Sequence, residues 1–182
     1  VAKERGLEPL AQKLFDQEKF DVDAFAASFI DAGKDVADAQ AALDGARDII
    51  AEWVSENPDT RKNVRELFWK EGVVTSKVMK GKETEGQKFK DYFEWNEPIA
   101  KTPSHRLLAM RRGEKEGILA LDIFPPEEEA IAKMERQYVK HDNAAAEQVK
   151  LAIKDAYKRL LRPSLETEVR METGYPWTGD VK

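Results

Sequence analysis

Apolar residues recur at three- and four-residue spacing along most of the chain, a pattern that predicts amphipathic α-helices. The clearest stripe runs through residues 35–56 and includes Leu43, Ile50 and Trp53. Pro58 should end that helix, because proline cannot continue a helix from an interior position. By the same spacing, further helices are expected over residues 4–17, 20–30, 60–72, 87–95, 104–113, 125–139 and 144–161, with a resumption after Pro163.

Two segments break this helical pattern. Val73–Met79 is rich in β-branched residues and residues 118–124 form a short apolar run, so both are expected to be strands that pair with each other. The fold class is therefore predicted to be mainly α, a multi-helical bundle with at most a small two- or three-stranded β element. The expected core consists of residues on the apolar faces: Leu43, Ile50, Trp53, Leu67, Phe68, Phe89, Phe93, Leu107 and Leu119.

Charge is distributed unevenly along the chain, whose net charge is −5. Residues 1–60 hold 6 basic and 14 acidic side chains, a net of −8, whereas residues 61–117 hold 14 basic and 9 acidic ones, a net of +5. A basic segment between acidic flanks indicates a polyanion partner, although weakly at this charge. We expect one helical region over 1–172, with acidic helices (1–60), basic helices with the short strands (61–124) and C-terminal helices (125–172), followed by an irregular tail (173–182).

Several kinds of chemistry are missing from the sequence. Cysteine is absent, which excludes disulfides and cysteine-based metal sites and fits a reducing, cytoplasmic location. No apolar run is long enough to span a membrane, so no membrane partner is expected. The two histidines, His105 and His141, have no second ligand at metal-binding spacing, and Ser104 is better explained as a helix N-cap than as a nucleophile. We therefore expect no enzyme activity, no cofactor and no metal.

The basic middle segment holds the candidates for contact with nucleic acid. Its loop KVMKGKETEG, residues 77–86, combines lysine and glycine in a way that suits close approach to a phosphate backbone. Trp95, beside Asn96, is the aromatic residue best placed for exposure and for stacking on bases. The candidate residues are Lys77, Lys80, Lys82, Lys88, Lys90, Trp95, Arg106, Arg111 and Arg112.

The three arginines of TPSHRLLAMRRGEKEG have two interpretations. At 100° per residue, Arg106 cannot share one narrow helix face with both Arg111 and Arg112. The arginines either pair with acids, such as Glu114, Glu116 or buried carboxylates, or they join the lysines in a phosphate-binding surface. Pairing is favoured for the arginines, because guanidinium groups suit buried ion pairs. The loop lysines fit solvated surface and phosphate contact equally well.

Three stretches resemble the Tex family of bacterial transcription accessory proteins: EPLAQKLF at 8–15, AALDGARDIIAE at 41–52, and residues 65–121, which contain GKETEGQKFKDYF and PSHRLLAMRRG. The resemblance implies a multi-domain, nucleic-acid-binding protein. Its N-terminal helical region carries helix-turn-helix-like elements, and an RNase-H-like domain, helix-hairpin-helix elements and an OB-fold follow. It also implies that this chain is the central part of that helical region. The final GYPWTGDVK departs from the family pattern, which continues as a charged helix.

Two functions remain open at this point. The first is a non-catalytic scaffold that contacts phosphates weakly through the basic middle segment, with RNA favoured over DNA. The alternative is a protein-interaction module that docks on the RNase-H-like domain or on the transcription machinery without touching nucleic acid. A continuous basic stripe over residues 77–112 favours the first, and a basic region interrupted by acids favours the second.

Overall fold

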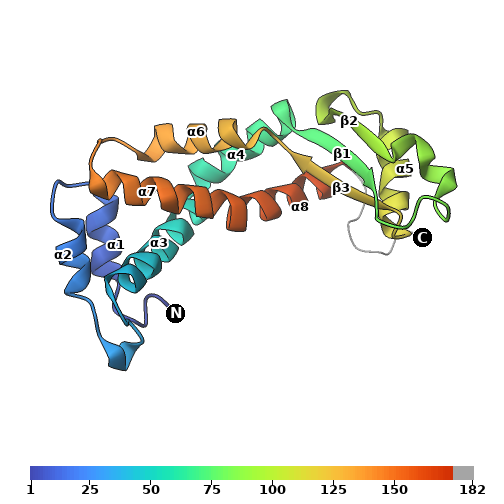
Figure 1. The fold of residues 1–182 in the computed structure, drawn as a ribbon. Coiled ribbons are helices and arrows are strands. Elements are labelled where there is room, and N and C mark those ends of the chain that lie inside the picture. The colour runs from blue at the N-terminus through green and yellow to red at the C-terminus, as the bar shows by residue number, and fades with distance from the viewer. Residues whose placement is uncertain (174–182) are drawn as a thin grey trace. The chain divides into compact units, whose positions relative to one another are not determined.

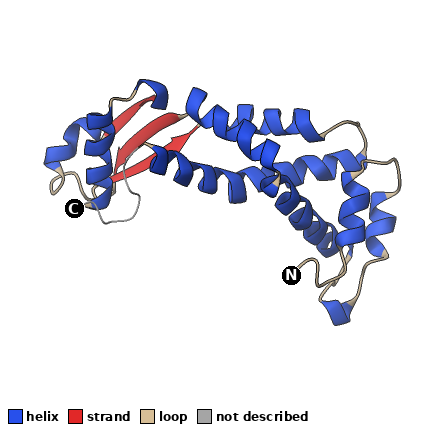
Figure 2. Ribbon diagram, turned by 180° about the vertical axis from the view of Figure 1, so that it is seen from behind, coloured by secondary structure: helices blue, strands red, loops and turns tan. Residues whose placement is uncertain are grey.

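The computed structural model describes residues 1–173, which form eight α-helices and one three-stranded antiparallel sheet (Figures 1 and 2). The predicted mainly helical fold class is confirmed. Residues 174–182, most of the predicted irregular tail, lie outside the described residues. The chain divides into two compact units, the first formed by residues 1–62 and 131–161 and the second by residues 63–130 and the chain from Arg162 onward.

The first unit is a helical bundle centred on α3 (Ala39–Glu56). Asp38 caps this helix, its carboxylate accepting the amide hydrogen of Ala41 at 2.7 Å, and aspartate is a favoured N-cap. Small residues on α3 allow close packing, since a Cβ at Gly45 would come within 2.3 Å of Leu7 Cδ1. The helices that pack on α3 are α1 (Glu8–Phe15), α2 (Val22–Ala27) and α7 (Ala144–Asp155).

The boundaries between the units fall within helices rather than loops. Two of them lie inside α4 (Pro58–Glu71) and α6 (Glu127–Tyr138), and the third lies where η4 (Ala156–Leu161), a π-helical segment after α7, meets α8 (Arg162–Glu172). Pro163 is the second residue after this π segment. Its nitrogen has no hydrogen and its ring crowds the carbonyl four residues earlier, and a wider turn accommodates both. The break predicted at Pro163 is thus a change of helix type rather than an interruption.

The second unit is built on the sheet. Its strands are β1 (Val73–Val78), β2 (Glu94–Pro98) and β3 (Leu119–Phe124), in the order β2-β1-β3. The predicted pairing of the first and last of these segments is confirmed, with Val73 opposite Phe124 and Val78 opposite Leu119. The prediction of a helix over residues 87–95 is wrong. A short 3-10 helix, η2 (Gln87–Tyr92), precedes β2 there instead.

The difference at β2 has a physical reason. The aromatic residues at positions 89, 92, 93 and 95 have the spacing of one helix face. The strand itself is five residues long and has only two half-buried positions among exposed ones, which is too few to establish a strand pattern. Trp95 and Glu97 are half-buried on one face of β2, and Glu94, Asn96 and Pro98 are exposed. Proline is tolerated here because β2 pairs with β1 on one side only.

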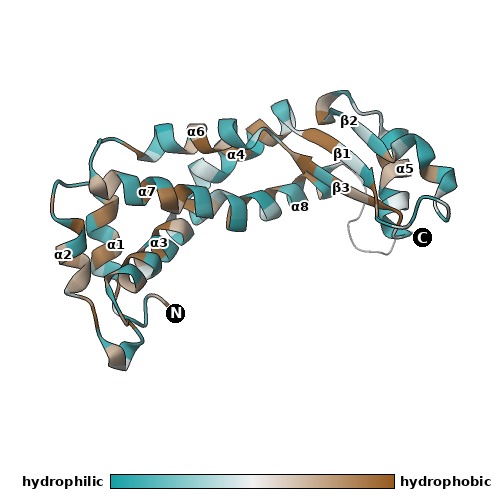
Figure 3. Ribbon diagram, viewed as in Figure 1, coloured by the Kyte–Doolittle hydropathy of each residue, from teal (hydrophilic) through white to brown (hydrophobic). Residues whose placement is uncertain are grey.

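One face of the sheet carries the core of the second unit. Val74, Leu121 and Ile123 are buried on that face, where α5 (Ser104–Lys115) and α8 contact β3 (Figure 1). Lys77 and Asp122 are exposed on the opposite face. Figure 3 shows apolar residues concentrated on β1 and β3 within this unit. An antiparallel sheet with one covered and one open face is common.

Most of the predicted core is buried. Trp53 and Phe93 are the exceptions, because both are only half-buried. The Trp53 ring lies at the border of the α3 stripe, with its centroid 5.7 Å from that of Phe15. The confirmed core residues are Leu43, Ile50, Leu67, Phe68, Phe89, Leu107 and Leu119.

Candidate nucleic-acid interface

The segment TPSHRLLAMRRGEKEG forms α5 and its exit turn. The N-cap position is occupied by Pro103, one residue before the predicted cap Ser104, and the chain leaves the helix through Gly117, whose φ is +77°. Gly113 lets the helix approach the sheet closely, because a Cβ there would lie 2.5 Å from Leu119 Cδ1. Leu107 and Met110 are buried on the same helix. α5 is therefore fixed in place by packing against the core of its unit.

Arg106 and Trp95 contact each other and share the carboxylate of Glu97. Arg106 Nη1 donates to Glu97 Oε2 at 2.7 Å, and its guanidinium carbon lies 5.2 Å from the Trp95 ring centroid. Trp95 Nε1 donates to Glu97 Oε1 at 3.2 Å, and the ring meets Tyr92 edge-on at 6.0 Å between centroids. The half-buried Trp95 thus has one carboxylate and one cation as neighbours.

Arg111 lies inside the second unit. It is 9% exposed, and its Nη1 donates to the backbone oxygen of Arg170 at 3.4 Å. Burial, followed by the positive charge of Arg170, lowers the pKa of Arg111, while Glu114 opposes this change. A side chain held in this way is not on the surface that a nucleic acid would touch.

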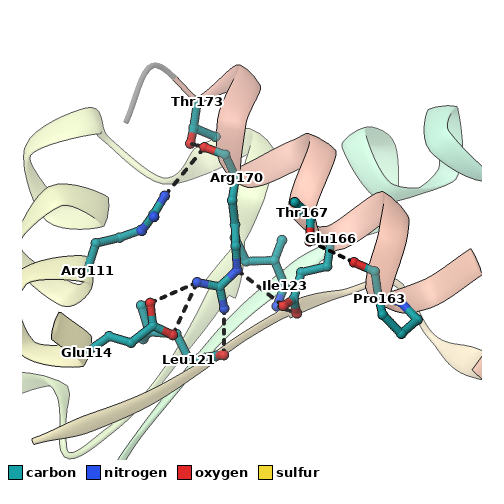
Figure 4. Close-up of polar contacts among 9 residues, drawn as sticks. All are labelled: Arg111, Glu114, Leu121, Ile123, Pro163, Glu166, Thr167, Arg170 and Thr173. Carbon is teal, nitrogen blue, oxygen red and sulfur yellow. Dashed lines mark hydrogen bonds and ion pairs between the residues drawn. The ribbon is translucent and has the colours of Figure 1, made fainter. Parts of the chain in front are cut away.

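Arg170 forms the centre of a buried cluster that the sequence did not reveal (Figure 4). It is 1% exposed, and its Nη1 lies 2.9 and 3.2 Å from the two carboxylate oxygens of Glu114. Its Nε donates to Glu166 Oε1 at 3.2 Å, and its Nη2 donates to the backbone oxygen of Leu121 at 2.7 Å. Glu114, expected to pair with an arginine of its own helix, pairs with Arg170 of α8.

Glu166 is the second carboxylate of this cluster. Its Oε2 accepts the amide hydrogen of Ile123 at 2.9 Å. Burial raises the pKa of Glu166, while the Ile123 amide and the Arg170 guanidinium partly offset that increase. The one sequence signal for the cluster is the four-residue spacing of Glu166 and Arg170 on a helix, which is common on solvent-facing helices as well.

The loop lysines are interspersed with acids. Lys82 Nζ pairs with Glu85 at 3.0 Å, and Lys88 Nζ pairs with Glu116 at 2.7 Å. These pairs and Arg106–Glu97 place acids among the basic residues of the segment 77–112. The remaining candidates are exposed: Lys77, Lys80, Lys90 and Arg112.

Other kinds of site receive no support from the described residues. Within residues 1–173, no group of three or more histidine, aspartate or glutamate side chains is arranged to hold a metal ion. Over the same range, no helix has both the length and the apolar character needed to cross a membrane.

Comparison with known proteins identifies the family. The Tex central region-like family model matches residues 17–173. The protein tex of Bordetella pertussis is 46% identical over 123 residues, covering 68% of this chain and 16% of that protein. The transcriptional accessory protein Tex of Neisseria gonorrhoeae is 40% identical over 134 residues, covering 73% of this chain and 17% of its own length. The uncharacterized protein YdcI of Bacillus subtilis is 39% identical over 175 residues, covering 94% of this chain and 24% of its own. The chain thus spans between a sixth and a quarter of these relatives, and it belongs to the Tex family, whose central region it represents.

Proposed function

We propose that this chain is a non-catalytic scaffold region of a transcription accessory protein, and that its surfaces contact protein rather than nucleic acid. The printed names of two relatives, protein tex and transcriptional accessory protein Tex, support the setting in transcription. The observation that carries the proposal is the internal pairing of the basic residues. Lys82, Lys88 and Arg106 are ion-paired, and Arg111 is buried.

Pairing weakens the case for nucleic acid in a specific way. Affinity for a polyanion comes mainly from counterions released when cations neutralise phosphates. A lysine whose charge is already balanced by a glutamate at 2.7 Å, as in Lys88–Glu116, contributes less to that release. The same acids repel a phosphate backbone that approaches the second unit. The other domains of the longer protein, or the transcription machinery, are therefore the partners we propose.

A second candidate function is weak phosphate contact through Lys77, Lys80, Lys90 and Arg112, which are exposed. It would favour RNA, would be independent of base sequence, and would involve at most four phosphates. The expected log–log salt slope is then about −3 to −4, because each contact contributes close to one unit. This candidate rests on exposure alone, since no described residue shows a built site for a phosphate.

A salt-varied titration separates the two candidates. The whole chain is titrated with a fluorescent 20-nucleotide single-stranded RNA and with duplex DNA of equal length, between about 50 and 200 mM salt. The scaffold function predicts a dissociation constant weaker than about 10⁻⁴ M at the higher salt, the weak limit of non-specific binding. Binding tighter than about 10⁻⁶ M with a slope near −3 would overturn it.

Matched variants make the titration specific to the second unit. One variant changes Lys77, Lys80 and Lys90 to glutamine. Its control makes the same change of charge in the first unit, at the exposed Lys3, Lys19 and Lys154. The scaffold function predicts that the two variants behave alike. Loss of binding in the first variant only would support phosphate contact by the second unit.

A further inference from the structure

The two edges of the sheet differ in how they are protected. The β2 edge is five residues long and carries Glu94 and Pro98, features that discourage pairing with another strand. The β3 edge has the sequence LALDIF, a six-residue run with a single charge and no proline. Runs of this kind pair readily with other strands when their backbone groups are exposed.

The strand register shows which groups of β3 point away from β1. The amide of Met79 donates to the oxygen of Ile118 at 2.8 Å, and pairing in an antiparallel ladder alternates along the strand. Ala120 and Asp122 therefore bond toward β1, whereas the backbone groups of Leu119, Leu121 and Ile123 point outward. The outward row is the part of β3 to which another strand could bind.

Two side chains of α8 occupy that row. Arg170 Nη2 donates to the oxygen of Leu121 at 2.7 Å, and Glu166 Oε2 accepts the amide hydrogen of Ile123 at 2.9 Å (Figure 4). One helical turn separates the two side chains, and its rise of about 5.4 Å is close to the roughly 6.8 Å between alternate residues of a strand. An acceptor and a donor on α8 thus replace the hydrogen bonds of a neighbouring strand.

We propose that the β3 edge is a strand-pairing surface that Glu166 and Arg170 keep closed, and that its occupant, once the edge is open, is β3 of a second copy. Antiparallel pairing about Leu121 brings Leu119 of one copy opposite Ile123 of the other. Every outward amide and carbonyl of these residues then has a partner. β2 cannot do this equally well, because Pro98 has no amide hydrogen to donate.

The same register is also compatible with the side chains of the open face. Asp122 of one copy lies opposite Ala120 of the other, so that no two like charges face each other across the pair. Within one copy, Ala120 lies opposite Lys77 of β1. An aspartate at position 120 would therefore face Lys77 in the monomer but Asp122 of the partner in the dimer. This asymmetry distinguishes association through β3 from association through any other surface.

The first test uses the exchange rate of the Ile123 amide hydrogen, measured by NMR on the whole chain. Glu166→Ala removes the acceptor, and we expect exchange to become about tenfold faster, the equivalent of one lost hydrogen bond. Glu166→Gln keeps an acceptor oxygen and should retain most of the protection. Glu168→Ala, on the same helix as Glu166, removes an ion pair with Arg65 of α4 and should leave the Ile123 amide unchanged. Equal protection in Glu166→Ala and in the unchanged chain would overturn the proposal.

The second test measures association by sedimentation. The double variant Glu166→Ala/Arg170→Met should form a dimer whose population rises with concentration, and adding Ala120→Asp should restore the monomer. A double variant that stays monomeric while folded, or a dimer that Ala120→Asp does not affect, would contradict the proposal. If the double variant does not fold, the exchange rate of the Ile123 amide in Glu166→Ala decides.

Discussion

The two units of this protein differ in the contacts that stabilise each of them internally. The first unit is a bundle in which small and aliphatic side chains of α1, α3 and α7 pack closely; a Cβ added at Gly45 would lie only 2.3 Å from Leu7 Cδ1. The second unit places a nearly fully buried arginine, Arg170, between two carboxylates and a strand edge. Apolar packing follows a short-range pattern that is visible in the sequence, whereas the arginine cluster joins α5, β3 and α8 across long separations.

The largest expected effect is the loss of Phe68 from the apolar core of the second unit. Phe68 is 0% exposed, so Phe68→Ala should lower the free energy of unfolding by about 4 kcal/mol. Trp53→Ala in the first unit should cost about half as much. Trp53 is only half-buried, and the water-exposed part of its ring contributes no burial free energy. Urea unfolding followed by circular dichroism measures both. A loss below about 1 kcal/mol for Phe68→Ala would show that α4 packs differently.

Arg170→Met is expected to have the next largest effect. It should lower the free energy of unfolding by about 3 kcal/mol, because it leaves Glu114 and Glu166 without their shared cation in a largely buried place. Arg159→Met is the control in the first unit, where the ion pair of Arg159 with Asp155 is exposed. It should cost about 0.5 kcal/mol or less. Equal effects of the two substitutions would remove the distinction between the units.

Gln17 provides the corresponding test of a polar contact in the first unit. It is 4% exposed, its Nε2 donates to the oxygen of Tyr138 at 2.7 Å, and its Oε1 accepts the amides of Lys140 and His141 at 3.0 and 3.3 Å. Gln17→Ala should therefore lower the free energy of unfolding by about 2 kcal/mol, through backbone groups left without partners. Gln12→Ala, at an exposed position of α1, is the control and should be close to neutral. A neutral Gln17→Ala would mean that the bundle does not depend on this contact.

The smallest expected effect is the pH dependence that Glu166 confers. Burial raises the pKa of Glu166 in the folded chain, and Arg170, Asp122 and Glu114 are the charged groups that act on it. The folded chain then binds more protons than the unfolded chain between the two pKa values, so this contribution to stability is lost as pH rises through that window. Glu166→Gln should make the free energy of unfolding less dependent on pH above about 4.3, the ordinary pKa of a glutamate. A steeper dependence in the variant would contradict the direction of the shift.

Much of the fold was predictable because it depends on local patterns. The stripe of α3, the stop near Pro58 and the pairing of β1 with β3 all follow from spacing and composition. β2 was missed because aromatic residues before and within it repeat at helical spacing. A strand that pairs on one side only leaves little alternation by which to recognise it.

The candidate site was less predictable than the fold. The arginines were expected to favour pairing, and Arg106 does pair, but its partner is Glu97 of β2, an element that the sequence did not reveal. Arg111 and Glu114 both meet Arg170, which lies more than fifty residues further along the chain. Sequence spacing constrains neighbours on one helix, and it does not identify partners that the fold brings from elsewhere.

The central functional claim is that Lys82, Lys88 and Arg106 of the second unit are engaged with its own acids. The most direct measurement is an NMR titration of the whole chain with a 20-nucleotide single-stranded RNA, with the lysine and arginine side-chain resonances observed at about 150 mM salt. The account predicts no saturable shift of Lys82, Lys88 or Arg106 up to about 10⁻⁴ M RNA, the weak end of non-specific affinities. Saturable shifts of these three residues at lower RNA concentration, with release of their ion pairs to Glu85, Glu116 and Glu97, would contradict it.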